Sequence, residues 1–221
     1  MPSITTENYL KAIYQLWEKH PEAHLVRLGE IAQELEVTAG TITTMIKRLA
    51  EKGLVEYHRR SGVRLTPEGL RQALQVVRRH RLVEYFLVNA LHMDWSEVHE
   101  DAEALEHAVS DRVLDRIDAM MGFPERDPHG DPIPGNDGRV PSAKPIPLHQ
   151  TVKGTLYEVS RIEDQEARIL ESVAELALKP GRRFSRLSDP ESGNSISLEM
   201  NHQNVSVPVV LASCILVRAV S

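Results

Sequence analysis

The sequence of 221 residues contains one cysteine, Cys214, so an intramolecular disulfide is excluded and a reducing compartment is favoured. Aromatic residues make up only 5% of the chain, and any packed core must therefore be mainly aliphatic. No apolar run approaches the roughly 20 residues that a membrane-spanning helix needs. The start, MPSITTENYL, has neither the basic residues nor the apolar core of a signal peptide. We therefore expect a cytoplasmic protein with no membrane segment.

Positive charge is concentrated in one segment, although the net charge of −6 would by itself argue against a nucleic-acid partner. Residues 38–81 contain ten lysines and arginines and three acidic residues, which gives this segment a net charge of +7. A basic segment inside an acidic chain is typical of a surface that contacts phosphates, whereas an isolated charge run is usually a solvated surface. The local fold decides between these two interpretations.

Hydrophobic spacing predicts a winged helix-turn-helix at residues 1–72. Apolar residues share one helical face in residues 6–19 and again in 28–35, and a three-residue turn leads to a third helix that ends before Gly53. Two short strands, 54–58 and 63–66, follow around a basic turn. This order of helices and hairpin is that of a winged helix-turn-helix.

A helical domain is predicted at residues 73–141. Thr66, Pro67 and Glu68 supply an N-cap, a first-position proline and a first-turn acid for a helix that extends to about residue 90. Asp94 and Glu97 resemble a capping box for a helix to about residue 109, and a further helix spans 110–122. Their apolar surface exceeds what one chain can bury, so we expect a homodimer. Residues 123–147 are rich in Pro, Gly and Asp, which predicts an ordered turn followed by a linker.

The last segment, 148–221, changes character. Residues 151–162 and 195–200 alternate like strands, 164–176 have helical spacing, and 205–217 are expected to form strands. These patterns predict a small β-barrel with one helix. The expected fold class is therefore mainly α with a small β domain.

The third helix presents a candidate DNA-reading surface. Its buried stripe comprises Ile42, Met45, Ile46 and Leu49, and the opposite face is threonine-rich and basic. Short hydroxyl side chains allow close approach to the major groove, and the basic residues contact phosphates. An exposed face without function is the alternative, but a row of β-branched residues lowers helix propensity and so favours a role. The candidate residues are Thr38, Thr41, Thr43, Thr44, Lys47, Arg48, Arg59 and Arg60.

A second pattern predicts a divalent metal. His80-x-x-x-Glu84 and His99-x-x-x-Glu103-x-x-Glu106-His107 place imidazoles and carboxylates on shared helical faces. Nitrogen and oxygen donors without thiolate suit Mn²⁺ or Fe²⁺ better than a structural zinc site. One His/Glu pair would more often be an ordinary surface pair, but two interlocking sets within 28 positions favour metal binding. His129, His149 and the other histidines lack such neighbours, and we expect them to be ordinary surface or loop residues.

Together these features resemble the diphtheria-toxin-repressor family of metal-dependent regulators, in its three-domain form and over essentially the whole chain. The motifs that carry the resemblance are ENYL at 7–10, TAGTIT at 38–43, GLV at 53–55, LTPEG at 65–69, RHRL at 79–82, EH and SD at 106–111, and DPHGDPIPG at 127–135. The last third resembles the SH3-like domain of the family, which is related to small ferrous-transport domains.

The resemblance implies two metal sites per subunit. One would comprise Asn8, Glu103, Glu106 and His107, and the other His80, Glu84 and His99, completed by Glu163 and Gln165, with Glu166 as an alternative donor. Glu103 stands where the iron-sensing branch has cysteine, so the chain resembles the manganese-sensing branch (manganese transport regulators). Asn8 stands where that family usually has methionine or aspartate, and Lys11 where short manganese sensors have a carboxylate.

The function predicted from these observations is a metal-dependent DNA-binding repressor with Mn²⁺, or alternatively Fe²⁺, as the cofactor. Its expected partners are a palindromic double-stranded operator and a second copy of the chain. The expected output is repression of metal-uptake genes; activation of efflux genes is the alternative. Two other classes remain open at this point, namely a winged-helix regulator without metal control and a di-metal carboxylate enzyme. No Ser-His-Asp, Cys-His or phosphate-loop pattern indicates enzymatic activity.

Overall fold

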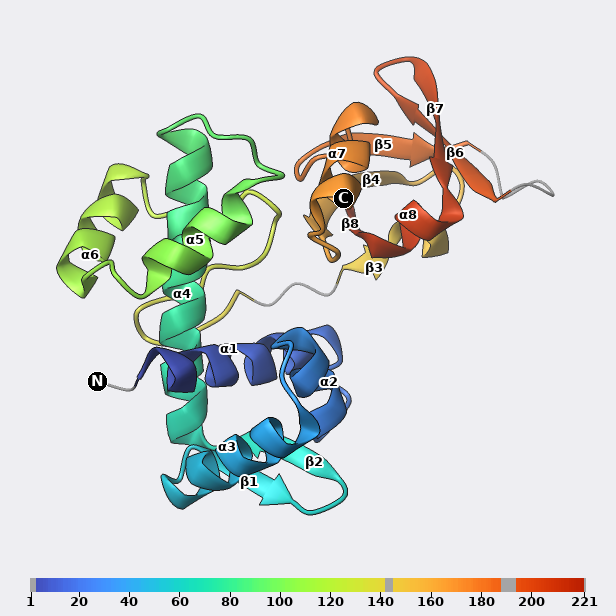
Figure 1. The fold of residues 1–221 in the computed structure, drawn as a ribbon. Coiled ribbons are helices and arrows are strands. Elements are labelled where there is room, and N and C mark those ends of the chain that lie inside the picture. The colour runs from blue at the N-terminus through green and yellow to red at the C-terminus, as the bar shows by residue number, and fades with distance from the viewer. Residues whose placement is uncertain (1–2, 142–144, 188–193, 221) are drawn as a thin grey trace. The chain divides into compact units, whose positions relative to one another are not determined.

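The computed structural model describes residues 3–141, 145–187 and 194–220 and divides into two compact units (Figure 1). The first unit comprises the chain up to His80 together with Glu106–Ser110 and Pro134–Arg139. The second unit comprises Arg81–Leu105, Asp111–Ile133 and the chain from Val140 onward. No helix among the described residues is long and apolar enough to cross a membrane.

The first unit is a winged helix-turn-helix followed by the start of a long helix. Its elements are α1 (Ile4–Lys19), α2 (Leu28–Glu34), α3 (Ala39–Glu51), β1 (Val55–His58), β2 (Gly62–Leu65) and the part of α4 (Pro67–Asn89) up to His80. The two strands pair antiparallel, with Val55 opposite Leu65. Each of these elements lies within about two residues of its predicted position, so the predicted winged helix-turn-helix is confirmed.

An aliphatic core holds the three helices of this unit to the wing. Leu10, Ile13, Ile31, Ile42, Ile46, Leu49 and Val63 are each no more than 1% exposed. Burial of each such side chain contributes about 1.5–3 kcal/mol relative to leaving it exposed. The helical spacing of these residues therefore fixes which face of α3 is buried and which face remains exposed.

The wing is joined closely to the start of α4. The Thr66 hydroxyl donates to the Gly53 carbonyl at 2.7 Å and accepts from the Gly69 backbone N–H at 3.1 Å. A Cβ atom on Gly69 would lie 1.9 Å from the Leu54 carbonyl oxygen. The junction therefore needs glycine at position 69, because any side chain would push α4 away from the wing.

Two shorter helices follow α4, namely α5 (Val98–Glu106) and α6 (Asp111–Met120). Helix α5 begins four residues later than the predicted capping box at Asp94. The Asp94 carboxylate instead accepts hydrogen bonds from the Ser96 N–H at 2.9 Å and the Ser96 hydroxyl at 2.6 Å. This local turn competes with helix formation, which explains the difference.

The C-terminal part of the second unit is a six-stranded antiparallel sheet in the order β3-β8-β4-β5-β6-β7. Two helices and a 3₁₀ turn accompany the sheet. The elements are β3 (Ile146–Pro147), β4 (Leu156–Ile162), α7 (Ala167–Glu175), β5 (Arg183–Arg186), β6 (Ser195–Met200), β7 (Gln203–Pro208), α8 (Val209–Cys214) and β8 (Ile215–Ala219). The predicted small β domain is confirmed, but the prediction of strands throughout 205–217 was wrong in its middle, where α8 forms.

The segment before this sheet domain is more buried than its composition predicted. Asp127, His129, Asp131 and Ile133 are all less than 9% exposed, and His129 is fully buried. Gly130 has φ +94°, and a Cβ atom there would lie 2.1 Å from the Ser160 carbonyl oxygen. The expectation that His129 is an ordinary surface or loop residue was therefore wrong.

Candidate metal centre and DNA-reading surface

The exposed face of α3 carries the predicted threonines. Thr38 caps the helix by accepting from the Thr41 N–H at 3.2 Å. The Thr43 and Thr44 hydroxyls donate to the carbonyls of Ala39 and Gly40 at 2.8 and 3.0 Å. These backbone bonds satisfy the hydroxyl protons, so the exposed oxygen atoms remain available as acceptors.

The basic residues of this surface lie on α3 and in the wing. Lys47 and Arg48 are exposed on α3, and Arg59 and Arg60 are exposed between β1 and β2. Arg64, also counted in the basic segment, instead pairs with Glu56 at 2.6 Å. Of the eight predicted DNA-contacting residues, all are exposed except Thr43, which is half-buried.

Asn8 Oδ1 and His107 Nε2, two atoms of the predicted first metal site, are buried without a hydrogen-bond partner among the described residues, as is Gln72 Oε1 of the same unit. The other ring nitrogen of His107, Nδ1, lies 2.7 Å from Glu7 Oε2. A carboxylate on Nδ1 fixes the tautomer that presents the Nε2 lone pair, which is the usual arrangement of a metal-binding histidine. Glu7 was not predicted as a site residue, because the resemblance pointed to its neighbour Asn8 and no helical spacing links Glu7 to His107, 100 positions away.

Glu106 lies beside His107 and is fully buried. Its Oε1 is 3.2 Å from His107 Nε2, and its Oε2 is 2.7 Å from His80 Nδ1. Burial alone would raise the pKa of Glu106, but the His80 hydrogen bond and the Lys11 charge outweigh it and lower the pKa. The Glu106 carboxylate is therefore held in its charged form, as a metal ligand requires.

Lys11 is an additional member of this cluster that the ligand predictions did not include. Its ammonium donates to Glu106 Oε1 and Oε2 at 2.9 and 2.8 Å, and its side chain is only 6% exposed. A buried lysine is rare unless it is paired. Lys11 therefore provides a positive charge within the chain at a predicted metal ligand.

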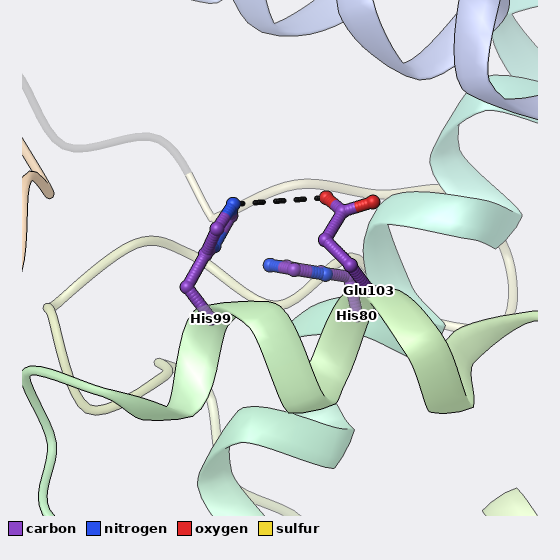
Figure 2. Close-up of side chains that lie close together, drawn as sticks. All are labelled: His80, His99 and Glu103. Carbon is purple, nitrogen blue, oxygen red and sulfur yellow. Dashed lines mark ion pairs between the residues drawn. The ribbon is translucent and has the colours of Figure 1, made fainter.

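In the second unit, Glu84 and His99 meet as predicted. His99 Nδ1 lies 3.3 Å from Glu84 Oε1, and Glu84 is 1% exposed. His99 Nε2 lies 3.7 Å from Glu103 Oε1, one turn along α5 (Figure 2). Glu103, assigned from the resemblance to the other metal site, thus contacts His99 in this unit. His80, also drawn in Figure 2, lies on α4 one turn before Glu84.

The two predicted donors from the C-terminal domain have other partners. The Gln165 side-chain amide donates to Asp131 Oδ2 at 2.6 Å. Glu163 Oε1 lies 3.6 Å from Arg161 Nη2, and Arg161 in turn donates to Asp131 Oδ1 at 3.0 Å. Both donors therefore belong to a network around Asp131 that joins β4 to the 127–133 segment.

Glu84 also belongs to a buried cluster with Asp127 and His129, whose candidate ligand atoms all lie within 4.8 Å of one another. Burial, followed by the charges of Asp131 and Glu84, raises the pKa of Asp127 well above its usual range. Burial lowers the pKa of His129, but the adjacent Glu84 carboxylate, with Asp127, outweighs it and raises the pKa to about 9. The sequence offered no spacing signal for this cluster, because its members are far apart in the chain.

Two family models match the chain. One, described as the N-terminal DNA binding domain of iron dependent repressors, covers residues 1–63. The other, described as the metal binding and dimerisation domain of iron dependent repressors, covers residues 66–135.

Individual proteins are similar over most of their length. The iron-dependent repressor IdeR of Mycobacterium leprae is 28% identical over 98% of this chain and 97% of its own. The transcriptional regulator MntR of Listeria welshimeri is 34% identical over 58% of this chain and 87% of its own. A solved structure of a manganese-dependent transcriptional repressor in complex with manganese has a TM-score of 0.87 and 40% identity, covering 97% of this chain and 100% of that one.

Proposed function

The chain belongs to the iron-dependent repressor family, also named for the diphtheria toxin repressor, whose members are metal-dependent DNA-binding transcriptional regulators, and we propose that it represses metal-uptake genes when it binds Mn²⁺. It binds DNA and a divalent metal and forms a homodimer, as the two family domains indicate. Because this family consists of transcriptional repressors, an enzymatic role and a regulator without metal control are no longer alternatives.

The first proposed metal site comprises Asn8, Glu106 and His107, with Glu103 on the same helix as Glu106. The observation that carries this assignment is the pair of buried donor atoms, Asn8 Oδ1 and His107 Nε2, without a hydrogen-bond partner among the described residues. Buried polar atoms are nearly always satisfied, so such a pair is expected where a ligand binds. The oxygen and imidazole donors fit Mn²⁺ or Fe²⁺.

The second proposed site comprises His80, Glu84 and His99, with Glu163 and Gln165 as donors from the sheet domain. The ion pair between His99 and Glu84 supports this assignment. The bonds that now hold Gln165 to Asp131 and Glu163 to Arg161 would have to rearrange for these two residues to reach a metal. We therefore propose two metals per subunit.

Manganese is the preferred metal in this proposal because the candidate sites contain no thiolate. Glu103 replaces the cysteine that the resemblance assigns to iron sensors, and carboxylate oxygen is a harder donor that favours Mn²⁺. Fe²⁺ is the alternative, since the similar proteins include both iron-dependent and manganese-dependent repressors by name.

Metal binding regulates DNA binding in this proposal by joining two segments of the first unit. Asn8 lies on α1 of the winged helix-turn-helix, whereas His107 follows α5. A bound cation would accept lone pairs from Asn8 Oδ1 and His107 Nε2 and would so hold α1 against the segment that follows α5. Exposed Val113 and Met120 on α6 and Phe123 after it provide apolar surface for the partner subunit. Two α3 helices held at a fixed spacing would match a palindromic operator in the cytoplasm.

A DNA titration tests the metal part of the proposal. An operator is first selected from random duplexes with Mn²⁺ present, and its affinity is then measured by fluorescence anisotropy in EDTA, Mn²⁺ or anaerobic Fe²⁺. Mn²⁺ should tighten binding by roughly 5–150-fold, the usual range of allosteric coupling. His107→Ala should abolish this response, the exposed control His24→Ala should retain it, and Glu103→Cys should shift the preference toward Fe²⁺. Equal affinity with and without metal would overturn the proposal, and a full response in His107→Ala would overturn the first-site assignment.

A salt titration tests the DNA-reading surface. Thr43→Ala combined with Lys47→Ala should weaken operator binding without changing Mn²⁺ uptake. Loss of the Lys47 phosphate contact in both subunits of the dimer should also reduce the slope of log affinity against log salt by about 1.8, which is 0.9 for each contact. Lys153→Ala, an exposed lysine of the sheet domain, is the matched control. Unchanged affinity and slope in the double variant would exclude this face.

A further inference from the structure

Hydrogen bonds on two sides hold the backbone of the segment 127–133, which carries His129 of the buried cluster. The His129 carbonyl accepts from the Ile162 N–H at 2.9 Å on β4. On the other side, Asp127 Oδ1 accepts from the N–H groups of His129 and Asp131, both at 2.9 Å. The backbone that carries His129 therefore has little freedom to move.

The His129 ring is held as firmly as its backbone. Its Nε2 donates to the Trp95 carbonyl at 2.7 Å, and its ring packs against the Trp95 indole with centroids 5.4 Å apart. These contacts direct Nδ1 toward Glu84, whose Oε2 lies 3.8 Å away. Nδ1 is buried and has no closer hydrogen-bond partner among the described residues.

Glu84 therefore lies between two imidazole rings. Oε1 faces His99 Nδ1 at 3.3 Å, and Oε2 faces His129 Nδ1 at 3.8 Å. His99 is partly exposed, with 44% of its side-chain surface accessible, while Glu84 and His129 are buried. A cation can reach the Oε1 side past His99, whereas the Oε2 side is closed by His129.

We propose that His129 is a positioning residue for the second metal site, where it holds the Oε2 side of Glu84 so that Oε1 remains directed at the position shared with His99. This inference rests on the proposed role of Glu84 and His99 as metal ligands. Partners of this kind orient the ligating side chain, and their removal usually costs 10–100-fold in metal affinity.

Two substitutions separate this role from a purely structural one. His129→Gln places an amide near the position of Nε2, so it retains a donor for the Trp95 carbonyl but loses the group that faces Glu84. His129→Asn places its amide near the position of Nδ1, so it retains a donor for Glu84 but loses the bond to Trp95. A structural role predicts that Asn is the more harmful change, whereas the positioning role predicts that Gln is.

The assay is a Mn²⁺ titration of the full-length protein by isothermal calorimetry, with free Mn²⁺ counted by electron paramagnetic resonance. His129→Gln should weaken the second binding event 10–100-fold and leave the first unchanged, while His129→Asn should weaken the second event less than tenfold. Thermal unfolding in EDTA shows whether each variant folds. Equal second-site affinity in wild type and His129→Gln would overturn the inference, as would a third bound Mn²⁺ that both variants lose.

Glu84→Gln distinguishes failure of this inference from failure of the proposed function. If Glu84→Gln removes the second event and His129→Gln does not weaken it, the metal site stands and the positioning role is wrong. If Glu84→Gln leaves both events unchanged, the second site itself is wrong and the role of His129 falls with it.

Discussion

Replacing Lys11 with methionine tests how an internal cation and a metal share one carboxylate. Lys11→Met removes the ammonium that donates to both oxygens of Glu106 and leaves the apolar stem in place. Glu106 is fully buried, so without metal its close partners among the described residues of this cluster would be the ring nitrogens of His80 and His107. Removing one partner of a buried pair costs about 3–5 kcal/mol, and the remaining His80 contact places this case near the lower end.

The magnitude follows from this loss. About 3 kcal/mol lowers the melting temperature of a chain of this length by roughly 6–12 °C, measured by calorimetry in EDTA. Bound Mn²⁺ would replace the ammonium as the counter-charge, so the loaded variant should lose much less. A substitution that destabilises only the metal-free protein increases the free energy of metal binding by the same amount, and 3 kcal/mol corresponds to about 100-fold in affinity. Lys11→Met should therefore bind Mn²⁺ roughly 10–100-fold more tightly than wild type.

Lys19→Met is the matched control, since Lys19 is exposed at the end of the same helix. It should change neither the metal-free melting temperature nor the Mn²⁺ affinity. Two outcomes would refute the reasoning about Lys11. One is an unchanged metal-free melting temperature in Lys11→Met, and the other is a weaker Mn²⁺ affinity, which would mean that the ammonium assists the metal rather than competing with it.

Two further predictions concern the second unit. Gly130→Ala should lower the unfolding free energy of the second unit by about 2 kcal/mol or more in urea, because the new Cβ atom would lie 2.1 Å from the Ser160 carbonyl oxygen and φ is +94°. Gly154→Ala is the control for backbone strain without a clash, since Gly154 has φ +79° and no atom within 4 Å of the added Cβ. Equal losses in both variants would contradict the close-contact argument. Hydrogen bonds from Arg218 and then Arg183 lower the pKa of Glu158, so its contribution to stability is present above the unfolded carboxyl pKa of about 4.3 and is lost as pH falls through the lower folded value. Glu158→Gln should therefore destabilise the sheet domain at neutral pH and progressively less in acid, and a difference from wild type that stays constant with pH would contradict this.

Local signals predicted the helical elements well. Ile42, Ile46 and Leu49 of the predicted stripe have helical spacing and are buried as expected, whereas Met45, predicted with them, is only half-buried. Thr66 and Pro67 begin α4 at the predicted position, and the i, i+4 spacing of His99 and Glu103 does bring them together. These predictions succeeded because each depends on residues within one or two helical turns.

Other features could not be predicted, either because one segment fits both a strand and a helix or because the feature depends on contacts between residues far apart in the sequence. The run VVLASC fits a strand or a helix equally, and the proline before it, Pro208, ends β7 where α8 begins. Glu7 reaches His107 and His129 reaches Glu84 only in the folded chain, across separations that no helical period covers. The resemblance marked Lys11 as standing where short manganese sensors have a carboxylate, but its burial against Glu106 depends on tertiary packing and could not be predicted.

The close contact between Gly69 and the Leu54 carbonyl means that α4 and the wing must move together. The helix extends about 20 Å from Pro67 to His80 at 1.5 Å per residue, and the close fit at its first turn fastens one end to the wing. A tilt of about 5° would therefore displace the His80 end by nearly 2 Å, a distance comparable to one metal–ligand bond. Under the proposed function, a small movement of the His80 imidazole would in this way tilt the winged helix-turn-helix, which carries the proposed DNA-reading surface.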